Sequence, residues 1–72
     1  MNSTDPAVNP KHYNGTDCLE AIAIATAELG GEEAFCTGNA IKYLWRWKQK
    51  NGIQDLNKAI WYIERLKQLH AK

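Results

Sequence analysis

The chain lacks most of the features that mark the common classes of membrane protein, metalloprotein and nucleotide enzyme. Its two cysteines, Cys18 and Cys36, match no usual zinc-ligand spacing. No apolar run is long enough to cross a bilayer and no signal-peptide pattern is present, so we expect a cytoplasmic protein with reduced thiols. The GxxxxGK(S/T) and GxGxxG loops are absent, and so are the clustered carboxylates of magnesium-dependent nucleotide hydrolases. These absences exclude a P-loop kinase and disfavour a hydrolase.

The formal net charge of +1 is unevenly distributed along the 72 residues. Residues 1–41 contain one basic and six acidic side chains, whereas residues 42–72 contain eight basic and two acidic ones. An anionic partner is therefore expected at the C-terminal half. Because the whole chain is nearly neutral, a small anionic ligand or the pairing of oppositely charged subunits is favoured over a broad nucleic-acid surface.

Hydrophobic periodicity predicts a small all-α domain with three helices. Residues 1–15 contain both prolines and are predicted to form an extended arm with a functional loop, and residues 16–72 to form the helical domain. The three helices are expected to run from a cap at Thr16 or Asp17 to Leu29, from Glu33 to Lys50, and from Ile53 or Gln54 to Leu69.

Each predicted helix has an apolar stripe that faces a core. Gly38 inside the second helix indicates that a neighbouring helix or a ligand comes close to the backbone there. Three Trp, three Tyr and one Phe are more aromatic residues than so short a chain is expected to bury alone, which predicts a homo-oligomer. The stripes consist of Leu19, Ile22, Ala23 and Ala27; of Ala34, Ile41, Leu44 and Trp45; and of Leu56, Ala59, Ile60, Ile63 and Leu66.

The second and third helices also carry polar stripes that suit a phosphate-bearing ligand, because they offer amide, phenol and cationic donors. The short Asn51-Gly52 link makes these helices antiparallel neighbours, so the stripes would border a shared cleft. The alternative is a pair of solvated faces, with Asp55 in an internal salt bridge to Lys58 or to a cation of the central helix. The stripes are Asn39, Lys42, Tyr43, Arg46 and Lys50, and Asp55, Lys58, Tyr62 and Arg65.

A third candidate region is the loop from Val8 to Gly15, which contains Asn9, His12 and Tyr13. Its histidine would serve as an acid, a base or a phosphate donor, and its tyrosine as a stacking surface. The alternative is an N-terminal tether whose tyrosine packs on the core.

The motifs VNPKHYN, GN-x-IKYLWR and DL-x-KA-x-WYI, over about residues 8–67, resemble the SaV-like family of bacteriophage proteins, whose domain has no assigned function. One longer member is similar in this domain and is known as a phage kinase of deoxynucleoside monophosphates. The resemblance implies a protein that works in the cytoplasm of an infected host cell. It marks as signature positions Asn9, Pro10, His12, Tyr13, Glu20, Phe35, Gly38, Asn39, Lys42, Tyr43, Arg46, Lys50, Asp55, Lys58 and Tyr62.

We therefore expect a homo-oligomeric nucleotide-binding protein, with its sites between subunits or between the second and third helices. One such function is the capture of a host defence signalling nucleotide. The alternatives are a small non-P-loop nucleotide kinase, which would use ATP and magnesium held by Asp55 or Glu20, and a nucleic-acid-binding accessory protein. Lys42, Arg46, Lys50 and Lys58 are expected to contact phosphate, Tyr13 and Tyr43 to stack on a base with Tyr62 beside them, and Asn39 and His12 to bind ligand edges.

Overall fold

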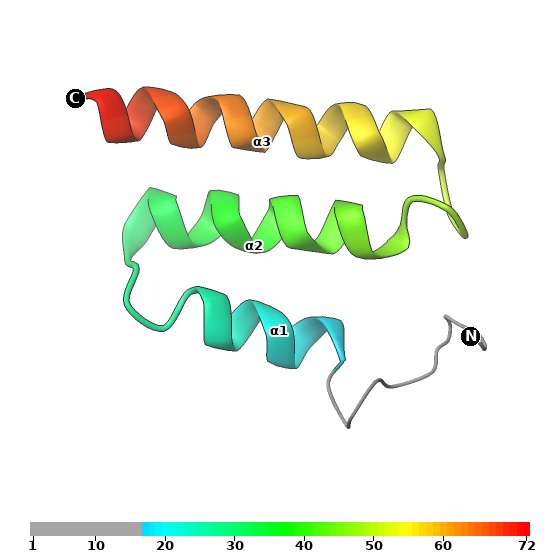
Figure 1. The fold of residues 1–72 in the computed structure, drawn as a ribbon, viewed down its shortest axis with the longest axis horizontal. Helices are drawn as coiled ribbons and strands as arrows, with labels where there is room; N and C mark the ends of the chain where they lie inside the picture. Colours follow the sequence, from blue (N-terminus) through cyan, green and yellow to red (C-terminus); the bar gives the residue numbers. More distant parts are fainter. Residues whose placement is uncertain (1–16) are drawn as a thin grey trace.

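Three α-helices in a single layer make up the part of the chain that this computed structural model describes, residues 17–72 (Figure 1). α1 spans Cys18–Ala25, α2 spans Gly31–Arg46 and α3 spans Ile53–Ala71. Neighbouring helices run antiparallel, and α2 lies in the middle because α1 and α3 each pack against it and not against each other. No strand occurs within the described residues. The predicted all-α, three-helix architecture is confirmed, while the predicted arm lies outside the described residues.

α1 begins where it was predicted but ends earlier. Asp17 caps it, since its Oδ1 accepts a hydrogen bond from the backbone N–H of Glu20 at 2.8 Å. The predicted end at Leu29 was wrong. The hydroxyl and backbone N–H of Thr26 both donate to the Ile22 carbonyl, at 2.7 and 2.9 Å, and the chain then leaves the helix in a tight turn. The Ala-Thr-Ala-Glu stretch has helical periodicity, so the sequence pattern alone did not reveal this turn.

α2 lies a few residues earlier in the chain than predicted, and α3 runs slightly longer. α2 starts at Gly31, whose φ of 53° only glycine adopts easily, and ends at Arg46 instead of Lys50. The connection after Arg46 is closed by a hydrogen bond of 2.8 Å from the backbone N–H of Gly52 to the Trp47 carbonyl. Gly52 has a φ of 55°, which redirects the chain into α3. The Asn51-Gly52 pair thus predicted the turn correctly, but the connection is longer than predicted because it already begins after Arg46.

The interior contains few large side chains. Among the described residues, those that are buried are Cys36, Ala40, Ala59 and one carboxylate, Asp55. The prediction of a close approach at Gly38 is confirmed, because a Cβ at that position would lie 3.1 Å from Cγ2 of Ile22 on α1.

The predicted apolar stripes are wrong in part, because a single layer covers only those sides of a helix that face its neighbours. Seven of the predicted stripe residues are instead exposed: Leu19, Ala23, Ala27, Leu44, Trp45, Ile60 and Ile63. Of the three helices described, none is both long enough and apolar enough to cross a membrane.

Candidate functional site

The two predicted polar stripes meet at a pair of stacked tyrosines, Tyr43 on α2 and Tyr62 on α3, which we call the tyrosine pair. The ring centroids lie 6.0 Å apart and the ring planes differ by 12°. Ala40 and Ala59, each about one turn before its tyrosine, are buried, and such small side chains allow two helices to approach closely. The close approach of α2 and α3 brings the two rings into contact.

Two more aromatic rings contact Tyr62. The ring of Phe35 meets it edge-on at a centroid distance of 6.0 Å, and that of Trp61 at 5.1 Å. Edge-to-face contacts of this kind stabilise aromatic clusters by about 0.5–1.5 kcal/mol per pair beyond their burial. The tyrosine pair is therefore held on more than one side, and its geometry is fixed by α2 and α3 together.

Three cations surround the ring of Tyr43. The distances to its centroid are 4.7 Å from Lys42 Nζ, 4.9 Å from Arg46 Cζ and 5.3 Å from Lys58 Nζ. Such cations are attracted by the negative charge on the ring face. Among residues 17–72, no carboxylate lies within 4.0 Å of Lys42 or Lys58. An anion that entered here would meet two ammonium groups that no described carboxylate neutralises.

The third cation, Arg46, is anchored to Asp55. Its Nε lies 3.3 Å from Asp55 Oδ2 and its Nη2 lies 3.5 Å from Oδ1. The carboxylate of Asp55 is fully buried and also accepts the backbone N–H of Asn51 at 3.3 Å and the side-chain Nδ2 of Asn51 at 3.4 Å. The alternative of an internal salt bridge from Asp55 to a cation of the central helix is thus confirmed, and the partner is Arg46 rather than Lys58.

Asp55 stays ionised in this setting. Burial alone would raise the pKa of Asp55, but the hydrogen bonds from Arg46 and Asn51 outweigh it and lower the pKa below its ordinary value. Both carboxylate oxygens are engaged by these donors, so the predicted use of Asp55 as a magnesium ligand does not fit its surroundings. Within the described part of the chain, no three His, Cys, Asp or Glu residues are grouped closely enough to hold a metal ion.

A cleft of about 270 Å³ lies beside the tyrosine pair and is lined by Tyr43, Lys58, Trp61 and Tyr62. We call it the tyrosine cleft. Trp61 was not among the predicted site residues, although its position one turn after Lys58 places it on the same side of α3. Its aromatic character suggested a core or interface residue, and its large exposure is visible only in the fold.

A neighbouring hollow of about 490 Å³ shares Trp61 with the tyrosine cleft and is otherwise lined by Glu32, Glu64, Arg65 and Gln68. Arg65 donates from Nε to Glu32 at 2.6 Å and from Nη1 to Gln68 at 3.1 Å. Arg65 was predicted on the polar stripe of α3 together with Lys58 and Tyr62. It is instead paired with Glu32 in the first turn of α2.

Of the remaining predicted residues, those that the structure describes do not line the tyrosine cleft, and the others lie outside the described residues. Asn39 donates from Nδ2 to the Phe35 carbonyl at 3.0 Å, and Lys50 lies in the exposed turn between α2 and α3. Asn9, His12 and Tyr13 lie outside the described residues. The structure thus brings together five of the predicted ligand-binding residues, which are Lys42, Tyr43, Arg46, Lys58 and Tyr62.

Both cysteines are free thiols, as predicted. Cys36 is buried and Cys18 is half-buried. Burial, together with the carboxylate of Asp17, raises the pKa of the Cys18 thiol. A raised pKa disfavours the reactive thiolate, so this cysteine has no sign of nucleophilic activation.

Comparison with known proteins places the chain in a family. The profile of DUF3310, described as a protein of unknown function, matches residues 7–64. No curated protein and no solved structure matches the chain. The matched residues include every predicted ligand-binding position, from Asn9 to Tyr62, and nearly coincide with the stretch that carries the motifs above. The chain therefore belongs to the DUF3310 family of proteins of unknown function.

Proposed function

We propose that the tyrosine cleft binds a phosphate-bearing nucleotide. The observation that carries this proposal is the convergence of three cations from two helices on the ring of Tyr43. α2 and α3 both supply cations to this one point, so the cluster depends on the packing of two helices and not on one solvated helix face. Lys42 and Lys58 are the phosphate ligands, since an ammonium group over an aromatic ring still has N–H groups to donate.

The aromatic rings have different roles in this proposal. The ring of Tyr43 is stacked on Tyr62 and surrounded by cations, so it organises the phosphate end of the cleft. Trp61 is 62% exposed and lines the same cleft, which makes it the ring best placed to stack on a base. A volume of about 270 Å³ is close to the lower end of the range for small-molecule sites. The ligand is therefore a mononucleotide, or part of a larger nucleotide that continues past Trp61 into the neighbouring hollow.

Binding without reaction is the favoured form of this function. Within the described part of the chain, Asp55 is the only carboxylate that hydrogen-bonds to a cation of the cleft, and Arg46 and Asn51 engage both of its oxygens. A protein that binds a nucleotide without altering it chemically would suit the capture of a host signalling nucleotide during phage infection. Phosphoryl transfer to a deoxynucleoside monophosphate from ATP and magnesium is the alternative, because the same lysines suit a transferred phosphate.

The test is a thermal-shift and calorimetric screen against nucleoside mono-, di- and triphosphates and cyclic di- and trinucleotides, with and without magnesium. The matched variants are Lys58→Met and Lys42→Met, which remove a charge and retain an apolar stem. Lys67→Met is the control, because Lys67 is an exposed lysine of α3 paired with Glu64 at 3.7 Å. A hydrogen bond to a charged group contributes about 1.5–3 kcal/mol, so each cleft variant should weaken nucleotide binding by roughly tenfold or more.

The outcomes separate the candidate functions. Recovery of the bound nucleotide unchanged identifies a capture protein, and a diphosphate product in the presence of ATP and magnesium identifies a kinase. Displacement of the nucleotide by random duplex DNA, with affinity that falls steeply as salt rises, identifies a nucleic-acid-binding protein. Equal nucleotide affinity for the wild type and the Lys58→Met and Lys42→Met variants would overturn the assignment of the cleft.

A further inference from the structure

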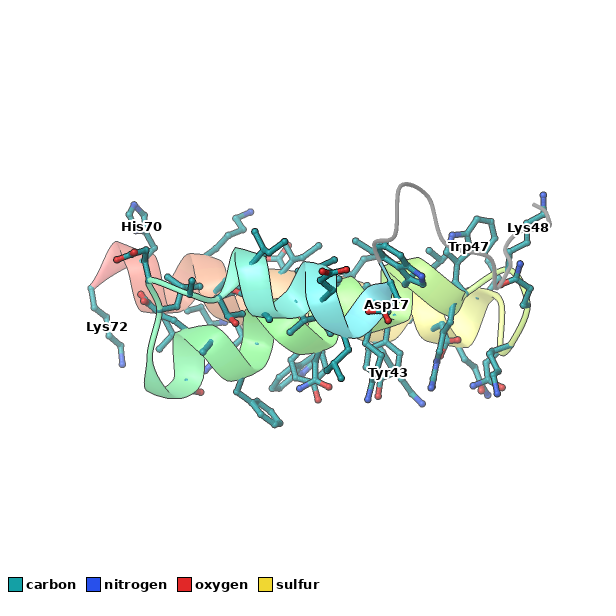
Figure 2. All side chains as sticks on the ribbon, turned by 90° about the horizontal axis from the view of Figure 1, so that it is seen from below. Asp17, Tyr43, Trp47, Lys48, His70 and Lys72 are labelled. Carbon is teal, nitrogen blue, oxygen red and sulfur yellow. The ribbon has the colours of Figure 1, made fainter. Side chains whose placement is uncertain are left out.

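The side of the helix layer that faces away from the tyrosine cleft carries several exposed apolar side chains. Figure 2 shows Trp47 and Lys48 pointing to the side opposite Tyr43. Leu44 lies two residues after Lys42 and two before Arg46, and helical periodicity therefore places it about 160° away from both cations. By the same argument Ile63 lies opposite Trp61 and Arg65, and Ile60 lies opposite Lys58 and Tyr62. We call the surface formed by Leu44, Trp47, Ile60 and Ile63 the far face.

All four residues of the far face are exposed in the single chain. Their exposed fractions are 49% for Leu44, 37% for Trp47, 54% for Ile60 and 40% for Ile63. With full side-chain areas of about 150–250 Å², these residues expose roughly 300–450 Å² of apolar surface. Each subunit of a standard homodimer buries about 800 Å², of which about two-thirds is apolar. The far face alone thus supplies more than half of the apolar area that one subunit needs.

The charges at the ends of α2 suit a partner that runs in the opposite direction. Glu33 precedes Leu44 by eleven residues, which places it on the same side of the helix, near the start of α2. Lys48 follows the end of α2 on that side (Figure 2). Among the described residues, neither side chain has an ion-pair partner. If the far faces of two copies pack together with their α2 helices antiparallel, Glu33 of each copy meets Lys48 of the other.

We infer that the far face pairs with the far face of a second copy of this chain, in a symmetric antiparallel dimer. The dimer is a two-layer bundle of six helices whose shared core consists of the far-face residues. Such an arrangement supplies the large buried side chains that one layer lacks, since the buried apolar residues among residues 17–72 are only Cys36, Ala40 and Ala59. Both tyrosine clefts then open outward, on opposite sides of the dimer, and each cleft is formed by the residues of a single subunit.

The test measures mass in solution by light scattering or analytical ultracentrifugation, with helical content checked by circular dichroism. The wild type should have twice the monomer mass of 8.2 kDa, and Leu44→Glu with Ile63→Glu should have the monomer mass. Ile24→Glu is the matched control, because Ile24 is 70% exposed and lies about 160° from Ile22, which contacts Gly38 of α2. The control should remain a dimer.

A charge exchange provides a second arm that does not depend on the stability of the core variants. Glu33→Lys alone should weaken dimerisation, and the addition of Lys48→Glu should restore it, because the reversed pair is again attractive. A wild-type mass of 8.2 kDa at the highest soluble concentration would overturn the proposal and leave the far face for a different protein. A dimer that survives Leu44→Glu with Ile63→Glu, or a double charge variant no better than Glu33→Lys, would overturn it equally.

Discussion

The contact between Gly38 and Ile22 predicts that Gly38→Ala changes stability in opposite directions with and without the Ile22 side chain. In a helix interior, alanine is favoured over glycine by about 1 kcal/mol. At Gly38, however, the new Cβ would lie 3.1 Å from Ile22 Cγ2, so α1 has to move or the side chain has to leave its rotamer. Overpacking of this kind costs about 1–3 kcal/mol. Gly38→Ala should therefore be neutral or destabilising by up to about 2 kcal/mol in the wild type.

Removal of the obstructing atom should reverse the outcome. In an Ile22→Ala background the Cβ at position 38 has room, so Gly38→Ala should stabilise by about 1 kcal/mol, which is roughly 4–8 °C in Tm for a domain of this size. The cost of Ile22→Ala cancels in the double-mutant cycle, and the coupling energy should be about 1–3 kcal/mol. Ile24→Ala is the control background and should give no coupling, because Ile24 is exposed.

The assay is thermal unfolding followed by circular dichroism at one fixed protein concentration, since the proposed dimerisation would make Tm concentration-dependent. If Gly38→Ala stabilises the wild type as much as it stabilises the Ile22→Ala variant, then Ile22 does not press on Gly38 and the described packing of α1 on α2 is incorrect.

Three further predictions concern the tyrosine cleft and its anchor. Arg46→Ala should lower Tm by roughly 10–20 °C in circular dichroism, because it leaves the buried Asp55 carboxylate without its cation, whereas an unchanged Tm would show that the pair is dispensable. Because the folded pKa of Asp55 lies below its ordinary value of 3.8, stability from this residue should be constant above about pH 5 and fall as pH drops below 3.8. In a series of Tm measurements against pH, Asp55→Asn should reduce the loss of stability at low pH. If this loss is the same in the variant, it arises from other carboxylates. Trp61→Ala should leave Tm within a few degrees of the wild type because the ring is exposed, yet weaken nucleotide binding about tenfold in calorimetry; full retention of affinity would remove Trp61 from the site.

Much of the fold was predictable because its signals are local. Asp17 as a cap, the Asn51-Gly52 turn and the close approach at Gly38 each depend on a few neighbouring residues, and all three are present. The end of α1 was not predictable in this way, because the Thr26 hydroxyl competes with the helix inside a stretch of good helix formers. Exposure of Leu44 and Ile60 was also missed, since periodicity shows which residues share a side but not whether a second layer covers that side.

The candidate site was predictable to the extent that it depends on two helices being neighbours. Lys42, Tyr43, Lys58 and Tyr62 are found together because the short turn makes α2 and α3 antiparallel. The sequence left open which cation binds Asp55, since Lys58 lies one turn after Asp55 on α3 and Arg46 lies at the end of the neighbouring helix α2. The choice of Arg46 follows from its forked guanidinium, which reaches both oxygens of a buried carboxylate as a lysine cannot.

The short first helix has a consequence for the order in which the molecule opens. α1 contains eight residues, too few for a stable helix in isolation, and of the two other described helices it packs only against α2. α2 and α3 are held together by the tyrosine pair and by the anchored Asp55 within one local hairpin. Amide hydrogens of α1 should therefore exchange with solvent deuterium well before those of α2 and α3. A chain that loses α1 in such a fluctuation still retains the hairpin that carries the tyrosine cleft.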